Sequence, residues 1–326
     1  MSSKFYGART ALSASCRWVK RADKAVRAPL CLVAVSATIF LSAQSRSAET
    51  NAVIPEKISP VPPRYQIAVC DWMILKRQKL GAFQLTKDIG ADGVEVDMGS
   101  LGQRETFASA LTNAATRQQF LDKARELNLG ISSIAMSGFY AQSFVERTNV
   151  TRLVQDCLDT MQALKVKVAF LPLGVTSDLL KHPELRPQVV ERLRAAGKQA
   201  QAAGVVIGVE TELDAAEQIK LLDEVGSPAI KIYYNLANAI QHQRDGVAEL
   251  KKLGKDRVCQ IHFSNQDAHW LQNDPLVNAP NLKSALDEMD WRGWLVIERS
   301  RDTNEVHNVK KNYGANAAYL KLVFQK

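Results

Sequence analysis

Apolar and polar positions follow two alternating patterns along most of this chain. From Tyr65 onward, short runs rich in β-branched residues are each followed by a longer segment with apolar residues at helical spacing. The short runs are almost continuously apolar, as buried parallel strands are. Strands are predicted at 67–71, 93–97, 130–135, 166–171, 205–210, 230–235, 258–263 and 294–298. Helices are predicted at 80–89, 114–127, 150–164, 187–203, 215–225, 247–253, 281–289 and 309–324.

Eight strand-then-helix units predict a single (β/α)₈ TIM barrel over residues 65–326. A doubly wound open sheet is the alternative architecture. No G-x-G-x-x-G or P-loop turn follows any of the predicted strands, so a nucleotide cofactor is not expected. Because no linker interrupts the alternation, one domain is expected rather than two.

The first 48 residues have a different pattern, which is typical of a secretory signal peptide. A basic segment precedes the apolar run 29–43 (PLCLVAVSATIFLSA), and small and polar residues follow it. The run is short for a membrane span, so stable membrane insertion after processing is not expected. Residues 49–64, with four prolines, are interpreted as a linker. The protein is therefore expected to be exported, periplasmic or extracellular, with an uncleaved membrane anchor as the alternative.

The charge of the chain is concentrated in this leader. Residues 1–48 carry eight Lys or Arg and one Asp, which leaves 34 basic and 33 acidic residues in the remainder. A nearly neutral body does not suggest a nucleic-acid partner. The three cysteines after the leader are scattered and odd in number, so they predict neither a disulfide framework nor a zinc site. A homo-oligomer is left open.

Polar residues stand where the last four predicted strands end. They are Glu210 followed by Glu212, Asn235 followed by Asn238, His262, and Glu298 followed by Arg299. In a TIM barrel the carboxyl ends of the strands meet at one mouth, where the chemistry takes place. A shared site of Glu210, Asn235, His262 and Glu298 is therefore predicted.

Two kinds of chemistry suit this set of residues. Two carboxylates, an imidazole and an amide oxygen can hold a hard divalent ion such as Mn²⁺, Mg²⁺ or Co²⁺. Two facing carboxylates, Glu210 and Glu298, can also act as general base and acid on a sugar carbon. The alternative is structural, because a strand-terminal Glu often caps a loop or pairs with Arg, and a lone His is often a satisfied core residue.

Further residues are candidates for substrate contacts, among them Glu212, Asn238 and Arg299 beside the shared site. Glu95 alternates with apolar neighbours on the second strand and is expected to face the barrel interior, either in the site or in a structural ion pair. Trp72 follows the first strand, where it can floor a sugar pocket. His269 and Trp270 lie in a polar loop whose composition suits sugar hydroxyls and ring stacking. Residues 137–140 are expected to form a lip or a surface turn.

From about residue 64 to the C-terminus, the chain resembles the xylose-isomerase-like TIM barrels known as sugar phosphate isomerases/epimerases. The stretches that carry the resemblance are IGADGVEVD, VVIGVETELDAAEQIKLL, IKIYYNLANA, VCQIHFSN and WLVIERS. In that family Glu, Asp, His and Glu on strands five to eight bind a divalent metal, and the two glutamates move the proton of a ketose. The resemblance implies that Glu210, Asn235, His262 and Glu298 occupy these places.

This chain departs from the family pattern at three of its positions. Asn235 replaces the strand-six Asp, Asn238 replaces a His common three residues later, and Ser264 replaces a Lys that often follows the strand-seven His. An amide in place of a carboxylate removes a negative charge and weakens cation binding. Whether the site binds a metal is therefore left open.

The expected function is that of a carbohydrate isomerase or epimerase that transfers a proton at a carbon next to a carbonyl. Because an exported protein meets few phosphorylated sugars, a non-phosphorylated sugar or a keto-glycoside is the expected small-molecule partner. An eliminating lyase would begin with the same proton abstraction. The alternative is a non-catalytic carbohydrate-binding barrel with a degenerate metal site, which Asn235 and Ser264 favour.

Overall fold

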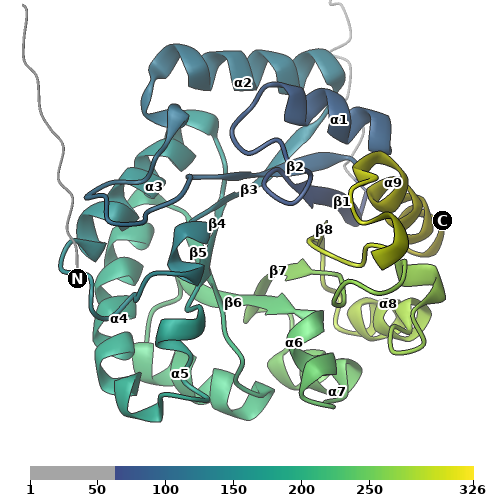
Figure 1. The fold of residues 1–326 in the computed structure, drawn as a ribbon. Coiled ribbons are helices and arrows are strands. Elements are labelled where there is room, and N and C mark those ends of the chain that lie inside the picture. The colour runs from purple at the N-terminus through teal and green to yellow at the C-terminus, as the bar shows by residue number, and fades with distance from the viewer. Residues whose placement is uncertain (1–62) are drawn as a thin grey trace, which may run out of the picture. The chain divides into compact units, whose positions relative to one another are not determined.

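The computed structural model describes residues 63–326, which form a closed parallel barrel with its strands in the order β1 to β8 (Figure 1). The strands are β1 Tyr65–Cys70, β2 Gly93–Asp97, β3 Gly130–Ala135, β4 Val168–Pro172, β5 Val206–Glu210, β6 Ile230–Asn235, β7 Val258–His262 and β8 Gly293–Ile297. Pairing of β1 with β8 closes the ring, with Ala68 opposite Val296. The predicted TIM barrel is thereby confirmed.

Helices surround the strands on the outside (Figure 1). They are α1 Gly81–Ile89, α2 Ala114–Leu127, α3 Val150–Leu164, α4 Arg186–Ala203, α5 Ala215–Val225, α6 Leu236–Gln241, α7 Gly246–Leu253, α8 Ala279–Glu288 and α9 Val309–Phe324. The C-terminal helix α9 packs against α1 and β1, so the first and last units adjoin. Among the α-helices of residues 63–326, only the short α6 has no counterpart among the helices that the sequence predicts.

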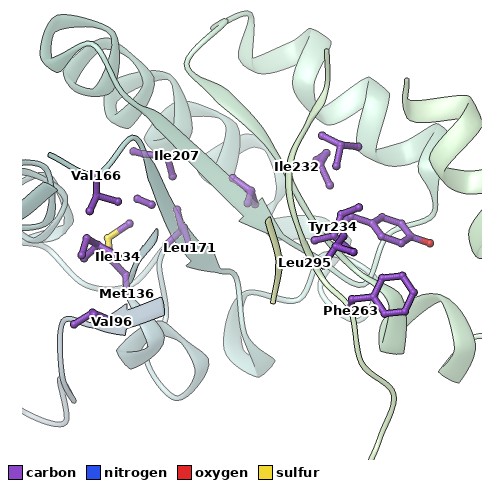
Figure 2. Close-up of a cluster of buried hydrophobic side chains, with 14 of the residues drawn as sticks. Val96, Ile134, Met136, Val166, Leu171, Ile207, Ile232, Tyr234, Phe263 and Leu295 are labelled. Atoms are coloured by element: carbon purple, nitrogen blue, oxygen red, sulfur yellow. The ribbon is translucent and has the colours of Figure 1, made fainter. Parts of the chain in front are cut away.

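Side chains alternate along the strands between two apolar layers. The larger layer contains residues such as Ile134, Ile207 and Leu295, which Figure 2 labels among the buried side chains of the sheet. The smaller cluster comprises Ala68, Cys70, Ala135, Phe170, Tyr233 and Val296, one or two residues from each of five strands. Small residues on β1 and β3 leave room inside the barrel for larger polar side chains from β2, β6 and β7, and these side chains lead to the site.

The N-terminal predictions lie outside the described residues. This applies to the signal peptide and to nearly all of the linker, so both stay predictions. Among residues 63–326, no helix combines the length and the apolar character that a membrane crossing needs. The cysteines of this part, Cys70, Cys157 and Cys259, are unpaired, in agreement with the expectation that they form no disulfide.

Candidate active site

Two buried carboxylates stand side by side at the carboxyl end of the barrel. Glu210 is the last residue of β5 and Glu298 directly follows β8. Tyr140 reaches both: its hydroxyl lies 3.0 Å from Oε1 of Glu210 and 3.1 Å from Oε1 of Glu298. The backbone of Glu298 is itself fixed, because Tyr313 on α9 donates a hydrogen bond to its carbonyl oxygen at 2.8 Å. The two carboxylates are thus joined through one phenol.

Asn235 makes a second bridge between the same carboxylates. Its Nδ2 atom lies 2.8 Å from Oε2 of Glu210 and 3.3 Å from Oε2 of Glu298. Its Oδ1 atom accepts a hydrogen bond of 3.0 Å from the backbone N–H of Ala237, which makes Asn235 the N-cap of α6. An N-cap needs a side-chain acceptor at this point, so the local fold directs the amide oxygen toward the helix and the N–H₂ group toward the carboxylates.

His262 lies beneath the carboxylate pair and is completely buried. Its Nδ1 atom is 3.1 Å from Oε2 of Glu210 and 3.8 Å from Oε2 of Glu298. Its Nε2 atom is 3.4 Å from Oε1 of Glu95 and 3.8 Å from the sulfur of Cys70. A ring held between carboxylates on both sides has its orientation set by both nitrogen atoms.

Glu95 anchors a second polar network inside the barrel. Its Oε2 atom accepts a 2.6 Å hydrogen bond from Ser133 and another from the hydroxyl of Tyr233. Gln260 donates to both of these hydroxyl groups, at 2.8 and 2.9 Å. Through His262 this network connects the floor of the barrel to the carboxylates at its mouth. Glu95 faces the barrel interior, as the alternation of β2 predicts, and its partners are hydrogen-bond donors together with His262.

Burial and neighbouring charge fix the protonation of several groups here. Burial raises the pKa of the Tyr140 phenol well above its usual value, and the carboxylates of Glu210 and Glu298 raise it further. The hydroxyl therefore stays protonated and donates. Burial also raises the pKa of Glu210, against an opposing hydrogen bond with His262. Burial works to lower the pKa of His262, yet the carboxylates of Glu298 and Glu95 outweigh it and raise the pKa well above its usual value.

A polar cavity of about 240 Å³ opens above the carboxylates. Its walls come from the segments after β3 and β4, the ends of β5 and β6, and the loops after β7 and β8. The lining residues are Tyr140, Leu173, Gly174, Val175, Asp178, Lys181, Glu210, Thr211, Glu212, Asn235, Ala237, Asn238, Gln241, Gln266, Glu298 and Arg299. Apart from one apolar wall, each surface of this cavity carries hydrogen-bonding groups, which suits a hydroxyl-rich small molecule.

The structure brings together most of the residues that the sequence assigns to a site. Asn235 and His262 each contact both Glu210 and Glu298. The expected substrate contacts that line the cavity are Glu212, Asn238 and Arg299.

Four other expected contacts do not line this cavity. Glu95 lies fully buried inside the barrel, in the hydrogen-bonded network described above. Trp72 stacks on Phe170 with ring centroids 6.4 Å apart. His269 is exposed, and Trp270 donates a 2.8 Å hydrogen bond to Asn312 on α9. The polar loop that holds His269 and Trp270 is thus directed at the outer helix.

Sequence reasoning missed Tyr140, Asp178 and Lys181. Tyr140 ends the short 3₁₀ helix Ser137–Tyr140, which the sequence suggests is a lip or a turn. Asp178 and Lys181 lie in the loop after β4, with their charged groups 3.0 Å apart. In the sequence, Tyr140 could be suspected only because it is an aromatic residue shortly after the end of a predicted strand. Loop composition does not identify Asp178 or Lys181 as site residues.

The residues only partly suit a metal ion. The ligand atoms of Glu210, His262 and Glu298 lie within 4.8 Å of one another and form a buried grouping that could hold one; Cys70, Glu95 and His262 form a second. At the fourth position, however, Asn235 presents N–H groups. Turning its amide would remove the cap of α6 and bring an oxygen toward two carboxylates. The four residues as they stand do not make a four-ligand metal cage, and the expectation of Mn²⁺, Mg²⁺ or Co²⁺ stays a prediction.

A closed parallel barrel with its polar site at the carboxyl ends of the strands defines a TIM-barrel protein. The model of the family described as "Xylose isomerase-like TIM barrel" matches residues 83–323, and the chain belongs to this family.

Relatives and solved structures extend this finding. The chain is 26% identical over 204 residues to the 2-epi-5-epi-valiolone 7-phosphate 2-epimerase of Actinoplanes sp., a match that covers 61% of this chain and 72% of the relative. Its fold resembles D-psicose 3-epimerase from Clostridium cellulolyticum H10, with a TM-score of 0.64 at 12% identity over 79% of this chain and 99% of that one. It also resembles 3-keto-D-glucoside 4-epimerase from E. coli, with a TM-score of 0.61 at 15% identity and the same coverage.

Proposed function

We propose that this protein is a carbohydrate epimerase or isomerase that transfers a proton at a carbon next to a carbonyl group. The observation that carries the proposal is the pair Glu210 and Glu298, two buried carboxylates that share the same donors at the floor of a polar cavity. Family membership and the epimerase activities named for three similar proteins support it.

In the proposed reaction one carboxylate removes the acidic hydrogen next to the carbonyl. In an epimerisation, the other carboxyl group returns a proton to the same carbon of the resulting enolate. In an isomerisation, the proton is returned to the neighbouring carbon. Asn235 and Tyr140 already direct hydrogens between the carboxylates. When a sugar enters, these hydrogens are available to an oxygen on which negative charge develops, the arrangement that stabilises an enolate.

The charge of the cavity favours an uncharged sugar as substrate. Its acidic residues are Asp178, Glu210, Glu212 and Glu298, and its basic residues are Lys181 and Arg299. The two cations are already engaged, Lys181 with Asp178 at 3.0 Å and Arg299 with Gln266 at 2.7 Å. A dianionic phosphate would meet an excess of negative charge here. The proposed substrate class is therefore a non-phosphorylated sugar or a keto-glycoside.

An apolar residue at the rim supports the keto-glycoside. Val175 lines the cavity while 67% of its surface remains exposed, and Leu173 lies on the same wall. An aglycone could cover this surface while the sugar ring occupies the polar part. Elimination of an aglycone would begin with the same proton abstraction as epimerisation does, so a lyase is the second reaction to assay.

The proposal predicts exchange of a carbon-bound hydrogen with solvent. Purified protein is incubated in deuterated water with a panel of free ketoses and 3-keto-glycosides, and each sugar is followed by NMR. At least one sugar should take up deuterium at the carbon beside its carbonyl, because the base that removes the proton returns one from solvent. The same panel with phosphorylated sugars should react more slowly. Binding of a sugar without exchange or elimination, with or without added metal, would favour the carbohydrate-binding alternative.

We further propose that the protein acts outside the cytoplasm, as the basic segment and the apolar run 29–43 suggest. Protein recovered from its native host should lack its first 43–48 residues, because a signal peptidase prefers small residues such as those after this run. Mass spectrometry of the N-terminus checks the cleavage, and cell fractionation checks the location. A soluble cytoplasmic form that keeps Met1 would contradict export.

A further inference from the structure

Every oxygen of the carboxylate pair lies within hydrogen-bonding distance of a donor group. The Oε1 atoms of Glu210 and Glu298 share the hydroxyl of Tyr140, at 3.0 and 3.1 Å. Their Oε2 atoms share the N–H₂ group of Asn235, at 2.8 and 3.3 Å, and Nδ1 of His262 lies 3.1 Å from Oε2 of Glu210. Three side chains therefore bridge the same two carboxylates. A divalent cation performs this task where carboxylates share a metal, since it draws both toward one centre.

The orientation of Asn235 follows from two independent sets of contacts. Toward the cavity its N–H₂ group meets two carboxylates, and toward the helix its oxygen accepts from the backbone of Ala237. The reverse orientation would place the amide oxygen against the carboxylate oxygens and the N–H₂ group against a backbone N–H. Acceptors would then face acceptors and donors would face donors, and each unmatched buried group would destabilise the fold. Asn235 thus presents donors to the site.

We propose that Asn235 replaces the metal in this barrel, so the site works without a divalent cation. Together with the hydroxyl of Tyr140, the N–H₂ group of Asn235 holds the catalytic carboxylates together. The same N–H₂ group serves as the electrophile for a substrate oxygen. A neutral donor suffices for this role because the site is buried and its hydrogen bonds are preorganised. The proposal concerns the cofactor of the site assigned above, and its test requires no knowledge of the substrate.

The test compares the affinity of wild-type protein and two variants for Mn²⁺ by isothermal titration calorimetry, after metal analysis of each purified protein. Wild-type protein should contain substoichiometric metal and bind Mn²⁺ with a Kd weaker than about 1 mM. Asn235→Asp should bind Mn²⁺ at least about tenfold more tightly, because a carboxylate oxygen then replaces the N–H₂ group and adds a negative charge at ligand distance. The Asp oxygen that caps α6 is retained, so the variant is expected to fold.

The matched control is Gln266→Glu. Gln266 also lines the cavity, and its oxygen accepts from Arg299 at 2.7 Å, so a glutamate there adds the same charge without touching the carboxylate pair. It should leave Mn²⁺ affinity within about threefold of wild type. An equal gain in both variants would indicate a general effect of charge and overturn the assignment to Asn235.

Stoichiometric metal in wild-type protein, or wild-type binding of Mn²⁺ with a Kd tighter than about 1 mM, would overturn metal independence while leaving the proposed reaction intact. This part of the test needs no variant, so it stands even if Asn235→Asp does not fold. Conversely, a wild-type protein that binds no Mn²⁺ and turns over no sugar supports the metal-free site but contradicts the proposed function. The two proposals therefore fail separately.

Discussion

Glu210→Gln and Glu298→Gln should each lower solvent-deuterium exchange into the sugar by about a hundredfold or more. Glutamine keeps the shape of the side chain but can neither remove nor return a carbon-bound proton, and loss of a general base typically costs this much. Because both carboxylates share Tyr140 and Asn235, the two variants should resemble each other more than either resembles wild type. NMR of each variant with a sugar that the wild type turns over measures the effect.

Glu249→Gln is the matched control for these two variants. Glu249 on α7 is also buried and also accepts a hydrogen bond from a tyrosine, Tyr234 at 3.0 Å, but it lies outside the cavity. This change should leave deuterium exchange within about threefold of wild type if Glu210→Gln and Glu298→Gln act through the proposed site. Retention of nearly full exchange by Glu210→Gln or Glu298→Gln would remove that residue from the proposed chemistry.

Glu95→Ala should lower the free energy of unfolding by about 3–5 kcal/mol. The change leaves the hydroxyls of Tyr233 and Ser133 without their acceptor, removes a carboxylate from beside His262 and opens a cavity in a closed interior. Removal of one partner from a buried charged, hydrogen-bonded network typically costs this much. Urea unfolding of both proteins, followed by circular dichroism, measures the difference.

Glu95→Gln separates the carboxylate's charge from its shape. A glutamine fills the same space and can still accept from Tyr233, so it should destabilise the protein by about 1–3 kcal/mol, less than the alanine does. If Glu95→Ala unfolds at the same urea concentration as wild type, the interior network contributes nothing to stability. In that case the orientation of His262 must depend on its other contacts, with Glu210, Glu298 and Cys70.

The barrel could be predicted from the sequence because, in each unit, the pattern of apolar residues distinguishes the strand from the helix. Strands 93–97, 130–135 and 230–235 have the predicted bounds, since an apolar run between turn residues fixes both ends. The sequence does not predict helix α6, because LANAIQ follows β6 without a break and the apolar run therefore reads as strand and loop. Helix α8 begins at Ala279, two residues before the predicted start at Asn281. Pro280 suggests a loop, although proline is well suited to the first turn of a helix.

The site could be predicted only where strand ends position it. Glu210, Asn235, His262 and Glu298 follow from barrel geometry, which brings the ends of parallel strands to one mouth. Tyr140 could not be found in this way, because no periodicity fixes the path of the loop after β3. Nor could the sequence tell which atom of Asn235 faces the carboxylates, since that depends on the capping bond to Ala237.

Asn235 both caps α6 and contacts the two carboxylates, and this combination affects how such a site can evolve. The residue at this position must accept a hydrogen bond from the start of α6, and only its other side-chain atom decides what the carboxylates meet. Asparagine and aspartate both meet the first demand, and their codons differ by a single base. A lineage could thus pass between a metal-free and a metal-binding barrel in one nucleotide substitution without losing the helix cap. In saturation mutagenesis at this codon, these two and the other capping residues should accordingly give the most stable variants.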